Sequence, residues 1–193
     1  DQEKEVGKLL QDYGTKRVLL LYGGGSIKRS GLYDIVVRSL TESQIEFVAL
    51  GGVRPNPTAS FVREALKLVK EKGIDFLLAV GGGSVIDTAK SIGVGAYYKG
   101  DPFDFNLKKA VPEKTMPVGV ILTIASAGSE SSNSCVIQDD EMGIKQGFNS
   151  DLIRPVFAIE NPKWALTVPS YQVFAGASDT MMHSLERYFN PSE

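Results

Sequence analysis

Two parts of the sequence combine residue types and spacing that could carry chemistry. The first is the run Gly81-Gly82-Gly83-Ser84, which directly follows the apolar segment 76–80. The second is the pair Asp179 and His183, four residues apart. Glycines between a buried strand and a helix let a phosphate approach backbone N–H groups. A carboxylate and an imidazole can together hold a divalent metal. The sequence therefore offers one candidate anion site and one candidate metal site.

Each motif also has an ordinary structural interpretation. A helix that starts at Ser84 could simply be well capped, because serine is a good N-cap and Asp87 stands three residues later, as in a capping box. Asp179 and His183 project from one helix face and could form only a hydrogen bond. A catalytic metal usually has three or more protein ligands, and the chain has one histidine. Either the metal interpretation is wrong or further ligands lie on chain that is absent.

Helices and strands are predicted to alternate along the chain. Apolar runs predict strands over 17–22, 46–50, 76–80, 117–124 and 156–159, and a hairpin over 135–148. Helical spacing predicts helices over 4–13, 32–40, 58–72 and 170–189. Such alternation predicts an α/β fold, Rossmann-like, with a mostly parallel sheet and helices on both faces.

Both glycine runs of the sequence follow predicted strands. Gly23-Gly24-Gly25-Ser26 follows strand 17–22 as the second run follows strand 76–80. In open parallel sheets, ligands bind outside the carboxyl ends of the strands. The polar stretch 125–134 follows a third strand, and its hydroxyls could bind ribose and phosphate, although a solvated loop would have the same composition. We therefore expect a nucleotide at this edge of the sheet.

Composition limits the classes of function. The chain has 193 residues, of which 42% are hydrophobic and 23% charged, as in soluble globular proteins. The net charge of −2 gives no indication of a nucleic-acid or membrane surface. The single cysteine, Cys135, excludes an internal disulfide and fits a reducing compartment, so a cytoplasmic location is expected. No segment is apolar for long enough to cross a bilayer, and the acidic start differs from a signal peptide.

Several stretches taken together resemble the iron-containing alcohol dehydrogenase family. They are 81–90 (GGGSVIDTAK), 128–130 (GSE) and 176–189 (GASDTMMHSLERYF), while 22–28 (YGGGSIK) and 55–57 (PNP) point to its butanol-dehydrogenase-like branch. The resemblance covers almost the whole chain. It implies a dinucleotide-binding α/β domain over 1–168 and, over 169–193, the first helix of an otherwise missing all-helical domain. By this resemblance the chain is an N-terminal fragment.

The resemblance also implies roles for particular residues. In the family, an Asp and three His hold one iron or sometimes zinc ion. Asp179 matches the aspartate and His183 the first histidine, so the other two histidines would lie beyond this chain. The positions that match the pyrophosphate loop and other contacts of the cofactor are Gly81, Gly82, Gly83, Ser84, Asp87, Thr123, Ser132 and Lys145. Ala127 departs from a threonine that is common in the family.

The first glycine run bears on the choice of cofactor. An acidic residue after this strand would bind the ribose 2′-hydroxyl and repel a 2′-phosphate. Here Gly23, Gly24, Gly25 and Ser26 occupy the place, with Lys28 and Arg29 nearby. Glycines leave space, serine can donate a hydrogen bond, and the cations favour a phosphate. We therefore expect NADP(H) rather than NAD(H).

The complete enzyme implied by the resemblance interconverts a primary alcohol and an aldehyde. The metal would act as a Lewis acid on the substrate oxygen, and the cofactor would exchange a hydride with the substrate carbon. Its expected partners are a small-molecule alcohol or aldehyde and a second copy in a homodimer, with no nucleic acid and no membrane.

Two other functions stay open at the level of the sequence. Glycerol dehydrogenases and dehydroquinate-synthase-like cyclases share the glycine loop and a metal in the cleft, although 186–188 (ERY) fits the alcohol dehydrogenase branch better. The chain alone could also be a nucleotide-binding module without activity, because half of the metal ligands are missing.

Overall fold

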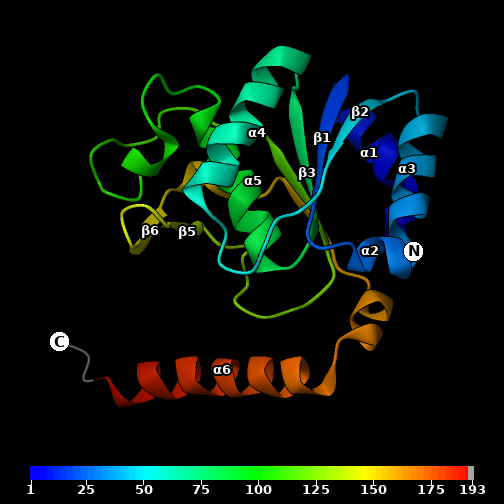
Figure 1. The fold of residues 1–193 in the computed structure, drawn as a ribbon. Coiled ribbons are helices and arrows are strands. Elements are labelled where there is room, and N and C mark those ends of the chain that lie inside the picture. Colours follow the sequence, from blue (N-terminus) through cyan, green and yellow to red (C-terminus); the bar gives the residue numbers. More distant parts are fainter. Residues whose placement is uncertain (191–193) are drawn as a thin grey trace.

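Five parallel strands form the central sheet in the computed structural model, which describes residues 1–190 (Figure 1). The strands follow one another across the sheet in the order β2-β1-β3-β4-β7, and every neighbouring pair is parallel. Their bounds are β1 (Arg17–Tyr22), β2 (Glu46–Leu50), β3 (Phe76–Gly81), β4 (Val118–Leu122) and β7 (Phe157–Ile159).

Helices cover both faces of this sheet, with α1 and α3 on one side and α4 and α5 on the other (Figure 1). The α-helices are α1 (Val6–Asp12), α2 (Ser26–Arg29), α3 (Leu32–Glu42), α4 (Ala59–Lys72), α5 (Gly83–Gly95) and α6 (Ser170–Phe189). Short 3₁₀ segments lie at Gln2–Glu5, Pro102–Asp104, Asp151–Ile153 and Pro162–Thr167. The predicted α/β fold with a parallel sheet is confirmed.

Alternate side chains of the strands belong to two separate cores. Leu77 and Ala79 of β3 pack in the core that contains α4 and α5. Leu78 and Val80 pack in the core that contains α1 and α3. Since both faces of β3 are covered, its sequence has no polar side and is a continuous apolar run. Complete burial of one leucine side chain stabilises the folded protein by roughly 2 kcal/mol. Burial of these strands therefore fixes the positions of the strand ends at which the glycine runs begin.

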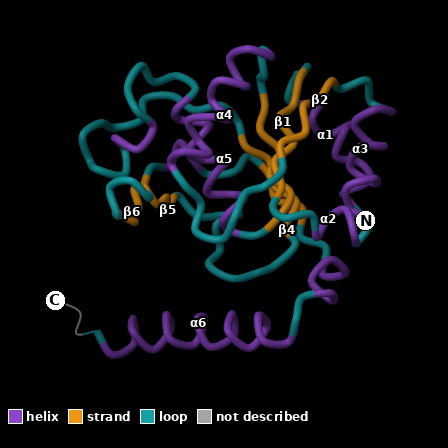
Figure 2. The backbone as a smooth tube through the Cα atoms, in the orientation of Figure 1, coloured by secondary structure: helices purple, strands orange, loops and turns teal. Residues whose placement is uncertain are grey.

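The predicted hairpin forms outside the main sheet, next to α5 (Figure 2). It consists of β5 (Ser134–Asp139) and β6 (Ile144–Asn149). Arg63 of α4 anchors it, because the guanidinium lies 2.7 Å from the carboxylate of Asp139 and 2.7 Å from that of Asp101. Burial alone would raise the pKa of Asp139, but the hydrogen bonds from Arg63 and from backbone N–H groups hold it below its ordinary value.

Helix α6 runs along one end of the α/β body (Figure 1), and a Cβ at Gly176 of this helix would lie 3.7 Å from the carbonyl oxygen of Ala125. None of its residues is buried. Its exposed large apolar side chains are Tyr171, Val173, Phe174, Met181, Met182, Leu185, Tyr188 and Phe189. The predicted helix over 170–189 is confirmed, whereas positions 191–193 of the predicted segment 169–193 lie outside the described residues. Within residues 1–190, no helix is both long enough and apolar enough to cross a membrane.

Candidate nucleotide site and metal-ligand pair

The strand order brings the two glycine runs to neighbouring strand ends. After β1 the chain passes through α3 to β2, then returns through α4 to β3 on the other side of β1. The register of β1 and β3 pairs Tyr22 with Val80, the residues that directly precede the turns. The runs 23–26 and 81–84 therefore begin side by side, at the carboxyl ends of two neighbouring strands. This position is the topological switch point, where open α/β sheets bind their ligands.

Helix α5 begins directly after β3 without a side-chain cap. Its N-cap is Gly82, and the helix starts at Gly83. The predicted capping role of Ser84 is therefore wrong, because Ser84 already lies in the first helical turn. Among residues 1–190, no side chain caps the first N–H groups of the helix. These groups and the helix dipole are thus available to an anion.

The three glycines before α5 have different surroundings. A Cβ at Gly81 would lie 2.6 Å from Cγ2 of Val85, and a Cβ at Gly82 would collide with Cγ2 of Ile124. Packing within the protein alone therefore requires glycine at these two positions. At Gly83 the nearest atom would be Cβ of Ser129, at 4.0 Å. Gly83 is thus the position where space remains beside the backbone, which fits the approach of a phosphate.

Asp87 does not close a capping box, so that part of the prediction is also wrong. Its carboxylate accepts hydrogen bonds from the hydroxyl of Ser129, at 2.6 Å, and from the N–H of Val136, at 3.0 Å. Burial raises the pKa of Asp87, and these two hydrogen bonds oppose the change. Asp87 therefore fastens the polar stretch and the hairpin to α5. Its contact with a cofactor stays a prediction.

Lys90 is a residue that sequence reasoning missed. Its side chain is completely buried, and its Nζ donates to the carbonyls of Ser132 and Ser134, each at 2.9 Å. Burial lowers the pKa of Lys90, and the nearby carboxylate of Asp87 acts in the opposite direction. No signal in the sequence marked this burial, because Ser84, Asp87, Thr88 and Ser91 form a polar stripe on α5 next to which an exposed lysine would be ordinary.

Ser26 and Thr123 line one pocket of about 230 Å³ at this edge of the sheet. The pocket lies between α2, the end of β4 and the start of α6. Trp164 also lines it, and the indole Nε1 is buried with no hydrogen-bond partner among the described residues. The structure thus brings together two predicted cofactor contacts that are distant in the sequence.

The other predicted contacts, Ser132 and Lys145, already bond within the protein. Ser132 accepts from Lys90 through its carbonyl. Lys145 of β6 donates to Oδ1 of Asn56 at 2.7 Å, in the loop that follows β2. Their roles toward a cofactor stay predictions.

Positive charge gathers after β1. The Nζ of Lys28 lies 5.1 Å from the ring centroid of Tyr22 and 5.0 Å from that of Tyr33, where cation–π attraction favours it. Gly25 has φ of +97°, a conformation suited to glycine. A Cβ there would lie 3.8 Å from the guanidinium of Arg29. No carboxylate occurs between residues 23 and 29, so this end of the site suits an anion.

Asp179 and His183 form an exposed pair on α6. The Nε2 of His183 lies 3.5 Å from Oδ1 of Asp179. The histidine side chain is 66% exposed and the aspartate side chain 50%. In the part of the chain that the structure describes, no three His, Cys, Asp or Glu side chains gather closely enough to hold a metal. The pair has suitable donor atoms for a divalent metal, but it needs further ligands.

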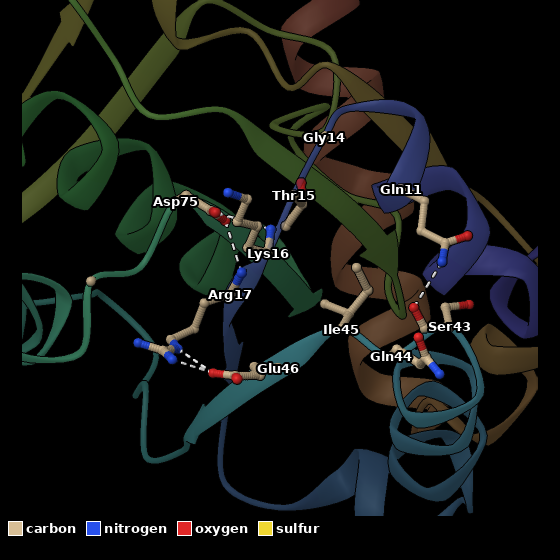
Figure 3. Close-up of a pocket in the computed structure, with 11 residues that line it drawn as sticks. Gln11, Gly14, Thr15, Lys16, Arg17, Ser43, Gln44, Ile45, Glu46 and Asp75 are labelled. Carbon is tan, nitrogen blue, oxygen red and sulfur yellow. Dashed lines mark hydrogen bonds and ion pairs between the residues drawn. The ribbon is translucent and has the colours of Figure 1, made fainter.

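A larger cavity of about 590 Å³ lies at the opposite edge of the sheet (Figure 3). Several of its polar groups already bond within the protein. Asp75 accepts from the N–H groups of Lys16, at 2.9 Å, and Arg17, at 3.1 Å, and Arg17 pairs with Glu46 (Figure 3). These residues lie at or just before the starts of β1, β2 and β3, so this cavity is at the amino ends of the strands, whereas such sheets bind ligands at the carboxyl ends.

Comparison with known proteins decides the family. The family model described as "Iron-containing alcohol dehydrogenase" matches residues 1–162. The chain belongs to this family. It is 48% identical to "Probable NADH-dependent butanol dehydrogenase 1" of Bacillus subtilis, over 94% of this chain and 46% of that protein. It is 39% identical to "NADPH-dependent aldehyde reductase YqhD" of Escherichia coli, over 89% of this chain and 45% of that protein.

The fold is also similar to solved structures of this family. The crystal structure of NADH-dependent butanol dehydrogenase A from Thermotoga maritima matches with a TM-score of 0.96 and 40% identity, over 100% of this chain and 48% of that one. The chain therefore spans about half the length of the relatives that it matches. The resemblance predicted from the motifs is confirmed at the level of the family. The names of the relatives include both NADH and NADPH.

Proposed function

We propose that the whole protein is a metal-dependent oxidoreductase that transfers a hydride between a nicotinamide cofactor and a primary alcohol or aldehyde, and that this chain supplies its nucleotide site. One observation carries the proposal. The two glycine runs lie at neighbouring strand ends, at the switch point of the sheet, and α5 begins there without a side-chain cap. A pyrophosphate is the anion that suits such an edge.

In this proposal the cofactor lies along the edge from α5 to α2. The N–H groups at Gly83 and Ser84 receive the pyrophosphate. The adenosine end enters the pocket that Ser26 and Thr123 line. A 2′-phosphate on its ribose would then meet the cations after β1. This charge supports NADP(H), while relatives named as NADH-dependent and as NADPH-dependent both occur.

Asp179 and His183 would hold iron or zinc together with ligands that the described residues do not supply. When bound, such a metal polarises the substrate oxygen as a Lewis acid. The role of the residues of this chain is to bind and orient the nucleotide, and none of them transfers a proton. We also propose that the protein is a cytoplasmic homodimer, and light scattering of the purified protein tests the dimer.

The experiment is a fluorescence titration of the full-length protein with NADPH and with NADH. We expect NADPH to bind about tenfold more tightly. Ser26→Asp would place a carboxylate at the end of β1 and should reverse this preference. Lys70→Met, at an exposed position of α4, should leave both affinities unchanged.

Each outcome of this titration has a separate meaning. Absence of binding for both nucleotides would overturn the dehydrogenase proposal itself. Tighter binding of NADH would overturn only the choice of NADP(H). Removal of metal with a chelator should abolish alcohol oxidation without changing nucleotide binding, and addition of Fe²⁺ or Zn²⁺ should restore it.

A further inference from the structure

Helix α5 carries two polar side chains whose partners all lie in one distant segment. Asp87 accepts hydrogen bonds from the hydroxyl of Ser129 and the N–H of Val136. Lys90, one helical turn later, donates to the carbonyls of Ser132 and Ser134. One side chain thus binds donors and the other binds acceptors of the same segment, 129–136. We name this arrangement the α5 clamp.

The charge of Lys90 makes the clamp costly to build. The side chain is completely buried, and no carboxylate of the described residues lies within ion-pair distance of its Nζ. A buried ammonium loses its hydration and regains only the hydrogen bonds that the protein offers. A methionine would fill a similar volume without this loss. Methionine, however, has no N–H group and cannot donate to two backbone carbonyls. We therefore explain the lysine by its hydrogen bonds to Ser132 and Ser134.

The held segment and the residues just before it lie directly against the glycine turn. Cβ of Ser129 is the nearest atom to the open side of Gly83. Ile124 fills the space beside Gly82, and the N–H of Thr123 donates to the carbonyl of Gly81 at 3.0 Å. The position of segment 129–136 therefore sets the width of the space beside Gly83.

We propose that Lys90, together with Asp87, is a positioning residue for nucleotide binding: the α5 clamp holds segment 129–136 at the separation from the glycine turn that a nucleotide diphosphate requires. This inference rests on the proposed function. Lys90 acts through the segment and touches neither substrate nor cofactor. A lysine with only a structural role would change the stability of the protein and leave the affinity of the folded protein for the nucleotide unchanged.

The test compares Lys90→Met with wild type in the full-length protein. Without nucleotide, hydrogen–deuterium exchange in segment 129–136 should be about tenfold faster in the variant, while exchange in β3 stays unchanged. The Kd and KM for NADPH should each rise about tenfold, and kcat at saturating NADPH should stay within about twofold. The control is Lys70→Met, because Lys70 is exposed on α4.

Unchanged exchange and an unchanged Kd in Lys90→Met would overturn the inference. A fall in kcat with constant KM would also overturn it. If Lys90→Met does not fold, Ser129→Ala decides, because it removes one donor to Asp87 without burying a new group. This variant should raise the Kd about threefold, and no change would refute the clamp. Failure of the wild-type protein to bind nucleotide would instead refute the proposed function, and the exchange rates measured without nucleotide would still report whether Lys90 holds the segment.

Discussion

The glycine turn before α5 and the Asp179–His183 pair on α6 differ in what holds them in place. The turn follows a strand that is buried along its whole length, and Ile124 and Ser129 pack against its glycines. The pair lies on a helix that has no buried residue, and both of its side chains are at least half exposed. One candidate site is fixed by the surrounding fold, and the other only by helical spacing.

This difference indicates how the two sites depend on the rest of the protein. A site made of backbone N–H groups is complete once the sheet, α5 and the segment 129–136 beside the turn have formed. A site made of two side chains is incomplete until further ligands arrive, since a metal usually needs three or more. Nucleotide binding and metal binding should therefore respond independently to substitution, and the following predictions test that independence.

The largest effect is expected for His183→Ala in the full-length protein. Loss of one proposed metal ligand should lower kcat at least about 100-fold and lower the bound metal content. The Kd for NADPH should stay within about twofold, because the glycine turn is unchanged. The measurements are metal analysis, steady-state kinetics and fluorescence titration. Met182→Ala, an exposed neighbour on α6, serves as the control. A large loss of nucleotide affinity in His183→Ala would show that the two sites are coupled.

Gly83→Val tests the opposite change, in which the proposed nucleotide site is altered and the Asp179–His183 pair is left intact. A Cβ at Gly83 would lie 4.0 Å from Cβ of Ser129, an ordinary contact, so the fold should tolerate a side chain there, but the side chain would occupy the place proposed for the phosphate. We expect the Kd for NADPH to rise at least about thirtyfold, with unchanged metal content. Titration and metal analysis of the same sample check both parts. An unchanged Kd would place the pyrophosphate away from this turn.

The buried region can be tested through Arg63→Met. Asp139, whose side chain is 3% exposed, would lose its charged partner, and unfolding free energy at pH 7 should fall by about 2 kcal/mol. The pKa values of Asp139 and Asp101 are lowered in the folded protein, so this contribution is complete above the unfolded pKa, about 4, and is lost as the pH falls below it.

Urea unfolding of wild type and Arg63→Met at pH 7 and at about pH 3 measures this difference. The gap between the two proteins should shrink at the lower pH. An equal gap at both pH values would mean that packing of the Arg63 side chain, rather than its charge, stabilises the hairpin.

The smallest effect is expected on α6. Phe174 is 70% exposed, so Phe174→Ser should change the unfolding free energy of the 193-residue chain by less than about 0.5 kcal/mol. Leu78→Ala in β3 should cost about 3 kcal/mol in the same assay. A cost above about 1 kcal/mol for Phe174→Ser would contradict the separation of α6 from the body.

Local patterns in the sequence predicted the elements well, but not the partners of individual side chains. The apolar runs identified β1 and β3 because burial on both faces leaves a continuous signal. Their adjacency was not visible, since it depends on the return of the chain past β1. The capping role given to Ser84 failed because residue type alone indicated a cap, while the tight turn after Gly81 starts the helix one residue earlier.

Contacts between distant segments account for most of what was missed at the site. Asp87 bonds to residues 42 and 49 positions away, and no periodicity predicts such pairs. Helical spacing predicted α6 and the Asp179–His183 pair, but it carries no information on what covers a helix. Two points stay predictions for the same reason. These are the further metal ligands and the choice between NADPH and NADH, and both depend on residues that local sequence patterns do not identify.

The way α6 joins the body has a mechanical consequence. Trp164 is buried in the 3₁₀ segment Pro162–Thr167, so the base of α6 is attached to the body. His183 stands about 20 Å along the helix axis from that base, whereas Gln172 stands about 4 Å from it. A tilt of about 10° would move the imidazole by about 3.5 Å and Gln172 by less than about 1 Å. Any rotation about this base would therefore be amplified at the imidazole and would leave the wall of the small pocket almost still.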